Sequence, residues 1–126
     1  MQTSAPDTHN DLRDAMRALC AQFPPEYHRR ESYPEEFVDA LTREGWLAAM
    51  IPEEYGGSGL GLTEASIIME EVNRCGGNAG HCHGQMYNMG TLLRHGSDEQ
   101  KQKYLPGIAS GALRLQSMAV TEPTTG

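Results

Sequence analysis

The 126-residue sequence contains no long uninterrupted run of hydrophobic residues, although such residues make up 38% of it. A helix that crosses a membrane needs about 20 consecutive apolar residues, so a transmembrane protein is excluded. The first residues, Met-Gln-Thr-Ser-Ala-Pro-Asp, have neither a basic patch nor an apolar core, and no signal peptide is expected. Length and composition instead predict one compact domain with its own core.

Basic residues and cysteines are both scarce. There are 10 Lys and Arg against 17 Asp and Glu, for a net charge of −7, which is the wrong sign for a nucleic-acid binder. Most of the acidic excess lies between Glu31 and Glu54, which predicts a solvated face. Cys20, Cys75 and Cys82 are an odd, sparse set, which argues against a disulfide scaffold and for a reducing cytoplasm.

The chain does have helical periodicity, first in the stretch before the prolines at 24–25 and again between residues 32 and 45. Apolar residues at steps of three and four predict a helix that is capped by Asn10 and stopped by the prolines at 24–25. The residues 32–35, Ser-Tyr-Pro-Glu, resemble a capping box that opens a second helix, and Gly45 ends it. The residues between these two helices, 26–31, are expected to form a polar link.

Three further helices are expected. The third covers about 63–74, with Glu71 on its outward face, and the fourth runs from about Ala79 to the glycine at position 96. The fifth begins with a second capping box at 97–100, and Pro106 inside it predicts a kink or an early end. The fold class is therefore all-α, an orthogonal bundle of about five helices.

Beyond the fifth helix the hydrophobic period changes from helical to alternating. Residues 113–120 alternate as a strand does. A lone strand cannot complete its own hydrogen bonds, so its ladder must be completed by a following domain or another subunit.

Two other patterns resemble ligand sites and are better explained by structure. The glycine-rich residues 56–61 lead into a helix as phosphate-binding loops do, but their spacing matches neither standard motif, and two glutamates precede them. His81, Cys82 and His83 resemble metal ligands, yet neighbours in a helix diverge by about 100° and cannot converge on one ion. No metal is expected, and Cys82 is interpreted as a core residue.

The end of the chain, Met118 to Gly126, reads as a strand that runs into a turn. A strand end offers main-chain N–H and C=O groups, and Thr121 adds a hydroxyl that donates or accepts. Such an edge suits a flat heteroaromatic ligand, although an ordinary strand and turn explain the same residues.

Four motifs in this order and spacing resemble the amino-terminal part of the acyl-CoA dehydrogenase family, over about residues 33–126. They are Gly-Trp at 45–46, Ile-Pro-Glu-Glu-Tyr-Gly-Gly-Ser-Gly at 51–59, Glu-Gln-Lys-Gln-Lys-Tyr-Leu-Pro at 99–106 and Ala-Val-Thr-Glu-Pro at 119–123. The resemblance implies a helical amino-terminal domain, a central β domain and a carboxy-terminal helical bundle, with FAD between them. Residues 1–112 are then the helical domain, and 113–126 are the first strand of a β domain that is otherwise missing.

The resemblance also implies a reaction, the α,β-dehydrogenation of an acyl-CoA thioester in fatty acid metabolism. A glutamate takes the α proton, and the β hydrogen leaves as a hydride to flavin N5. The implied parent is a cytoplasmic flavoprotein oxidoreductase and a homo-oligomer, usually a tetramer, that passes electrons to an electron-transferring flavoprotein. That base lies in the carboxy-terminal bundle of the family, so no catalytic residue is expected in this chain and the chain alone is expected to be inactive.

Site residues follow from the same resemblance. The flavin-contacting positions are Met118, Ala119, Val120, Thr121 and Gly126. Many relatives have an aromatic residue at the position of Met118, so ring stacking is not carried over. The acyl pocket positions are Ala79, His83 and Tyr87. A histidine and a tyrosine there favour a short, branched or polar acyl group, and the competing interpretation is that both pack against neighbouring helices.

Two alternatives to a dehydrogenase remain. A non-catalytic helical module would use its open strand and its acidic face to dock partner subunits. An acyl-CoA oxidase-type flavoenzyme would share the fold and differ in how oxygen reaches the reduced flavin. A base glutamate farther along the parent chain would favour an enzyme, and oxygen reactivity would separate oxidase from dehydrogenase.

Overall fold

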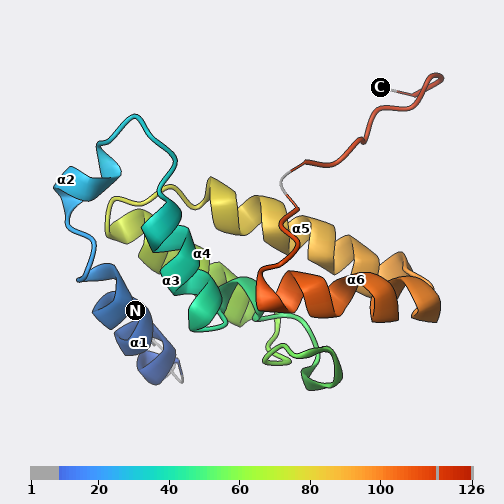
Figure 1. The fold of residues 1–126 in the computed structure, drawn as a ribbon, viewed down its shortest axis with the longest axis horizontal. Coiled ribbons are helices and arrows are strands. Elements are labelled where there is room, and N and C mark those ends of the chain that lie inside the picture. The colour runs from blue at the N-terminus through green and yellow to red at the C-terminus, as the bar shows by residue number, and fades with distance from the viewer. Residues whose placement is uncertain (1–8, 116, 126) are drawn as a thin grey trace, which may run out of the picture.

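The computed structural model describes residues 9–115 and 117–125. In these residues the chain forms α-helices and two short 3₁₀ turns, and the all-α fold class is confirmed (Figure 1). The elements are α1 (Asn10–Cys20), α2 (Pro25–His28), α3 (Glu35–Arg43), η1 (Trp46–Ala48), η2 (Glu53–Tyr55), α4 (Leu62–Arg74), α5 (Gly80–His95) and α6 (Asp98–Ser110). No helix in this described part is both long and apolar enough to cross a membrane.

Two groups of buried side chains hold the helices together. The larger group joins α1, α3, α4 and the first half of α5, with Met16, Phe37 and Ile68 almost fully buried. The smaller group joins η1, α5 and α6 around Met89 and Leu105. Figure 1 shows α5 and α6 running beside each other, and α1 packs along α4. Burial of these apolar faces is the main favourable term for the fold.

The first two helices start differently from the prediction. α1 begins at Asn10, with His9 at the N-cap, because the His9 carbonyl already accepts from the Arg13 amide at 3.0 Å. α3 begins after Pro34, without the capping box at 32–35. A residue before proline avoids the helical region, so Tyr33 cannot be the first helical residue after a Ser32 cap.

Two prolines have effects that the pattern did not predict. Residues 26–31 were expected to be a link, but Pro25 starts the single turn of α2, and proline favours that first helical position. Helix α6 continues past Pro106 to Ser110, so of the two expected effects, a kink or an early end, the early end does not occur. The capping box of α6 is confirmed, because Ser97 Oγ accepts from the Gln100 amide at 3.2 Å and Gln100 Oε1 accepts from the Ser97 amide at 2.9 Å.

The glycine-rich loop is a structural turn. The Gly59 amide donates to the Ile51 carbonyl, and the Leu60 amide donates to the Ala49 carbonyl, both at 2.8 Å. A Cβ on Gly57 would overlap the Ile51 carbonyl, so this close approach requires glycine. The amide groups at 59 and 60 are therefore used inside the loop and are not offered to a phosphate.

The prediction for Glu71 is wrong. Its side chain is 2% exposed and faces α1, where Arg13 and Arg17 donate to its carboxylate. The acidic residues from 31 to 54, in contrast, are all exposed as predicted.

The strand expected at 113–120 is not formed in the described residues. Residues 113–115 and 117–125 follow α6 as an extended segment, the tail, which first lies against the helices and then runs away from them (Figure 1). Its one described bridge pairs Glu122 with Thr125. This result agrees with the physical argument that an edge needs a neighbour before it forms a ladder.

Candidate functional site

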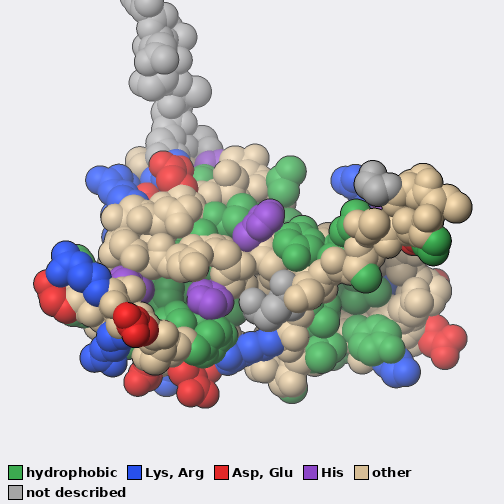
Figure 2. All heavy atoms as spheres, turned by 90° about the horizontal axis from the view of Figure 1, so that it is seen from above, with side chains coloured by type: hydrophobic (Ala, Val, Ile, Leu, Met, Phe, Trp, Pro, Cys, Tyr) green, Lys and Arg blue, Asp and Glu red, His purple; other side chains and the backbone are tan. Residues whose placement is uncertain are grey.

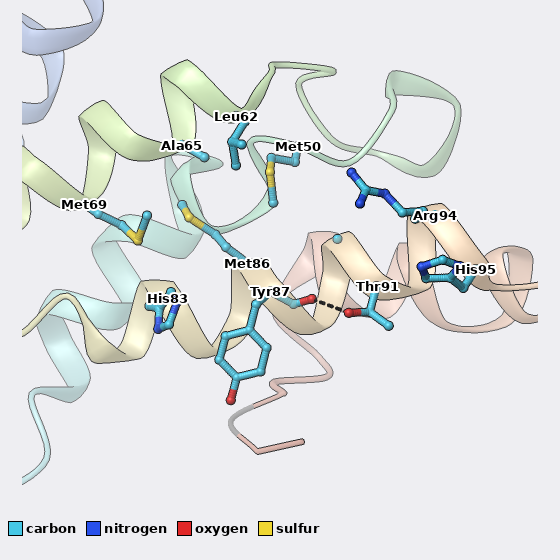
Figure 3. Close-up of a pocket in the computed structure, with 11 residues that line it drawn as sticks. Met50, Leu62, Ala65, Met69, His83, Met86, Tyr87, Thr91, Arg94 and His95 are labelled. Carbon is cyan, nitrogen blue, oxygen red and sulfur yellow. Dashed lines mark hydrogen bonds between the residues drawn. The ribbon is translucent and has the colours of Figure 1, made fainter. Parts of the chain in front are cut away.

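An apolar groove of about 470 Å³ lies between the amino-terminal half of α4 and α5. Three methionines point into it: Met69 from α4, Met86 from α5 and Met50 from the turn after η1 (Figure 3). Leu62 and Ala65 lie above them. Methionine is flexible and polarizable, so such a lining adapts to apolar groups of different shape. Leu62 is 77% exposed, so the apolar lining reaches the surface there.

His83 and Tyr87 both contribute to the groove, one turn apart on α5. Their rings contact edge to face, with centroids 5.0 Å apart. His83 is exposed and Tyr87 is half-buried, and Figure 3 shows the Tyr87 ring on the side of α5 away from α4. Ala79, the third predicted pocket residue, lies instead in the larger buried core.

The carboxy-terminal end of the groove is polar. Arg94 and His95 form the last turn of α5, and both are exposed. Cationic side chains are favoured there by the partial negative charge at a helix carboxy terminus. The groove therefore combines an apolar middle with a polar end.

The same helix holds the start of the tail. Gln85 is 1% exposed, and its Oε1 accepts from the Leu115 amide at 2.8 Å. The neighbouring Arg114 donates to Asp39 at 2.6 Å and to the Tyr33 hydroxyl at 3.4 Å. Together these bonds join the tail to α3 and α5.

Sequence reasoning missed Gln85 and Arg114 as anchors. The available signal for Gln85 was its place directly beside the core residue Met86, since a buried glutamine needs a partner. No local signal could identify the partner, which is thirty residues away in the chain.

The predicted flavin-contacting residues lie on the tail beyond this anchor. Met118, Ala119, Val120 and Thr121 are exposed, with Val120 at 71%, and Gly126 lies outside the described residues. Among the described residues, the backbone bonds of the tail beyond Leu115 are confined to the Glu122 and Thr125 pair. The main-chain groups of 118–121 and the Thr121 hydroxyl thus fit the polar edge of a heteroaromatic ring system such as the flavin of FAD.

Two histidines of α5, His81 and His83, pack against aromatic rings. The His81 ring contacts Tyr33 with centroids 5.0 Å apart, and His83 contacts Tyr87 as described above. Figure 2 shows histidine side chains lying among hydrophobic ones on the face of the molecule that it presents. Burial raises the pKa of the Cys82 thiol to about 12. Within the part of the chain that the structure describes, no three His, Cys, Asp or Glu side chains converge as metal ligands would.

Comparison with known proteins assigns the family. The domain described as "Acyl-CoA dehydrogenase, N-terminal domain" matches residues 6–112. The chain therefore belongs to the acyl-CoA dehydrogenase family and corresponds to its amino-terminal helical domain, as the motifs predicted.

Individual relatives agree with this assignment. Acyl-CoA dehydrogenase FadE12 of Mycobacterium tuberculosis is 36% identical over 120 residues, which is 91% of this chain and 31% of that protein. Mitochondrial isovaleryl-CoA dehydrogenase of Pongo abelii is 40% identical over 93 residues, covering 72% of this chain and 22% of that protein. The chain thus spans about a third or less of these relatives.

A solved structure has the same fold. The glutaryl-coenzyme A dehydrogenase in complex with glutaryl-CoA superposes with a TM-score of 0.77 at 26% identity. The match covers 100% of this chain and 34% of that chain.

Proposed function

We propose that this chain is the helical amino-terminal domain, residues 1–112, of an FAD-dependent acyl-CoA dehydrogenase, with 113–126 beginning the β domain. The observation that carries the proposal is that one helix, α5, contributes both to the apolar groove and to the attachment of the tail. It lines the apolar groove with His83 and Tyr87, and it holds the base of the tail through Gln85. An acyl group in the groove and a flavin at 118–121 would then meet beside α5.

The residues of this chain bind and orient, and the proton acceptor is not among them. The methionine-lined middle of the groove would hold the apolar acyl group and exclude water. The chemistry that FAD supplies when bound is acceptance of a hydride from the acyl β carbon. The Thr121 hydroxyl and the main chain near Val120 would hold the ring edge. Removing the α proton falls to a glutamate outside this chain, so the chain alone has no dehydrogenase activity.

The remaining parts of the proposal come from the family. The parent works as a homo-oligomer, takes an acyl-CoA substrate and passes electrons to an electron-transferring flavoprotein. Its cytoplasmic location is inferred from the sparse cysteines and not from the family. A structural neighbour whose description names an electron transferring flavoprotein has the same helical fold. That likeness, at 24% identity, supports the fold alone.

The acyl site is tested in the complete parent enzyme with His83→Ala. His81→Ala is the matched control, because His81 is also on α5 but packs on Tyr33 outside the groove. We expect His83→Ala to change the ratio of kcat/KM between short branched and long straight acyl-CoA thioesters by roughly tenfold. His81→Ala should leave that ratio in place. An unchanged ratio in both variants contradicts the acyl role of His83.

The proposed flavin contacts at 118–121 are tested by Thr121→Val in the same enzyme. Thr124→Val in the adjoining turn is the control. We expect only the first variant to lose flavin absorbance on gel filtration. Equal retention by both variants contradicts the role of Thr121.

A further inference from the structure

Two thiols and an imidazole meet where α1 ends against the end of α4. Cys20 is the last residue of α1, and Cys75 caps α4. Cys20 Sγ lies 3.9 Å from the Glu71 carbonyl, and Cys75 Sγ lies 3.1 Å from the next carbonyl, that of Val72. His28 Nε2 from α2 is 3.9 Å from Cys75 Sγ. Three separate elements therefore bring these groups to one helix end.

The two thiols, Cys20 and Cys75, are open to small reagents on one side. Cys20 and Cys75 both line a surface hollow of about 470 Å³, together with Arg17 and Arg74. Cys75 is half-buried, whereas Cys82 is fully buried and contributes nothing to the hollow. The groove on α5 does not include Cys20 or Cys75, so this hollow is separate from it.

The two thiols differ in reactivity. Burial, and then a hydrogen bond with the Cys75 thiol, raise the pKa of the Cys20 thiol to about 12. Cys20 therefore stays protonated at neutral pH, and the accessible Cys75 is the thiol that reacts first. Burial lowers the pKa of His28, so its imidazole is neutral and can accept a proton.

The backbone beside Cys75 has room to adjust. Helix α4 has ended there, and Gly76 follows with φ +92° and no atom within 4 Å of the position of its missing Cβ. A small shift of this turn can bring the Cys75 sulfur to bonding distance without disturbing the packed side of α4.

We propose that Cys20 and Cys75 are a reversible modification site, which a hydroperoxide such as hydrogen peroxide closes to a disulfide and a dithiol reopens. The Cys75 thiol passes its proton to His28, and its sulfur attacks one peroxide oxygen. The O–O bond breaks, the departing hydroxide takes the proton back from His28 as water, and Cys75 becomes a sulfenic acid. The Cys20 sulfur then attacks the Cys75 sulfur, the S–O bond breaks, and a second water leaves with the Cys20 proton. The two sulfurs lose two electrons, which the peroxide gains.

The disulfide would join α1 to α4 across residues 20–75. A cross-link over such a long loop reduces the conformational entropy of the unfolded chain. We expect oxidation to raise Tm by roughly 5 °C or more, and reduction by a dithiol to reverse the rise.

The test oxidises the whole chain with hydrogen peroxide, blocks remaining thiols with iodoacetamide and maps tryptic peptides without reduction. Trypsin leaves Cys75 and Cys82 in the same peptide, 75–94, so the mapping is done in parallel on wild type and on Cys82→Ala. We expect peptide 18–29 to be linked to peptide 75–94 in both proteins. Cys20→Ser and Cys75→Ser should lose the link together with the rise in Tm.

A further variant tests the imidazole. His28→Phe keeps a ring of similar size, and we expect it to slow closure roughly tenfold while Cys20 and Cys75 still pair at the end point. The proposal is overturned if oxidation gives a sulfinic acid at Cys75 beside an alkylated Cys20. It is equally overturned by a disulfide between two copies of Cys75.

Discussion

The Glu71 carboxylate on α4 and the Arg17 guanidinium on α1 form a two-pronged ion pair, with N–O distances of 3.1 and 3.0 Å. Arg13, one turn earlier on α1, adds a third bond at 3.1 Å. The bonds from Arg17, and then those from Arg13, hold the pKa of Glu71 below its ordinary value despite its burial. A charge-assisted pair of this geometry fixes how α1 lies on α4.

Replacing Glu71 with glutamine should lower the free energy of unfolding by roughly 1–3 kcal/mol, because Arg13 and Arg17 lose a charged acceptor that is itself buried. Urea unfolding at pH 7 measures the change. Glu70→Gln is the matched control, since Glu70 is the neighbouring glutamate and is exposed with one bond to Arg13. Equal decreases in the free energy of unfolding for the two substitutions would show that the buried ion pair stabilises the fold no more than the exposed one.

Acid should weaken the fold through the same carboxylate. The pKa of Glu71 is lower in the fold than its ordinary 4.5, so its contribution is complete above that value and is lost as pH falls through the folded pKa. We expect the free energy of unfolding to fall more steeply from about pH 5 to pH 3 in wild type than in Glu71→Gln. Parallel curves for the two proteins would contradict this.

Glu71 also shows where the sequence stops being sufficient. The helix at 63–74 and its buried stripe through Ile68 and Val72 follow from periodicity alone, because each helix carries that signal locally. The inward turn of Glu71 does not, since its partners lie 54 and 58 residues earlier in the chain. Charged residues are usually exposed, so the pattern favoured the wrong face.

In the candidate site, too, some features follow from local sequence and others depend on residues far apart in the chain. Family motifs predicted that His83 and Tyr87 share a face of α5, and the structure places both on one groove. The three methionines of that groove come from two helices and a turn, and no local pattern relates Met50 to Met86. The tail carries a strand pattern. A β-sheet hydrogen-bond ladder needs two strands, and the described residues provide only one such segment.

Gln85→Leu should release the base of the tail. Leucine has a similar volume and no acceptor, so the Leu115 amide loses its 2.8 Å bond, at a cost of about 1 kcal/mol. Hydrogen exchange measured by NMR should become faster at Leu115 and stay unchanged at amides inside α4. Arg114→Gln breaks the neighbouring ion pair with Asp39 and serves as the comparison. If exchange at Leu115 is the same in Gln85→Leu as in wild type, Gln85 does not hold the tail.

Gly111→Ala tests how α6 ends before the tail. Gly111 has φ +80°, where alanine is strained by about 1–2 kcal/mol, and a Cβ there would also overlap the Thr42 methyl group of α3. Gly76→Ala has the same kind of backbone conformation with open space around it, so it measures the strain alone. We expect Gly111→Ala to lower the unfolding free energy more than Gly76→Ala in urea titrations. A smaller effect at Gly111 would mean that α3 yields to the new methyl group.

His28 should give the fold a second pH dependence, near neutrality. The ring packs edge to face on Phe37, with centroids 4.9 Å apart, and burial lowers its pKa below the ordinary 6.5. The unfolded chain therefore binds a proton first as pH falls, so the free energy of unfolding should decrease between about pH 7 and the folded pKa. His28→Phe keeps the aromatic contact and cannot titrate, so its curve should be flatter over that window. Above about pH 8 the two curves should run parallel, which is the internal control. Identical slopes below pH 7 would mean that the His28 imidazole is protonated as easily in the folded chain as in the unfolded one.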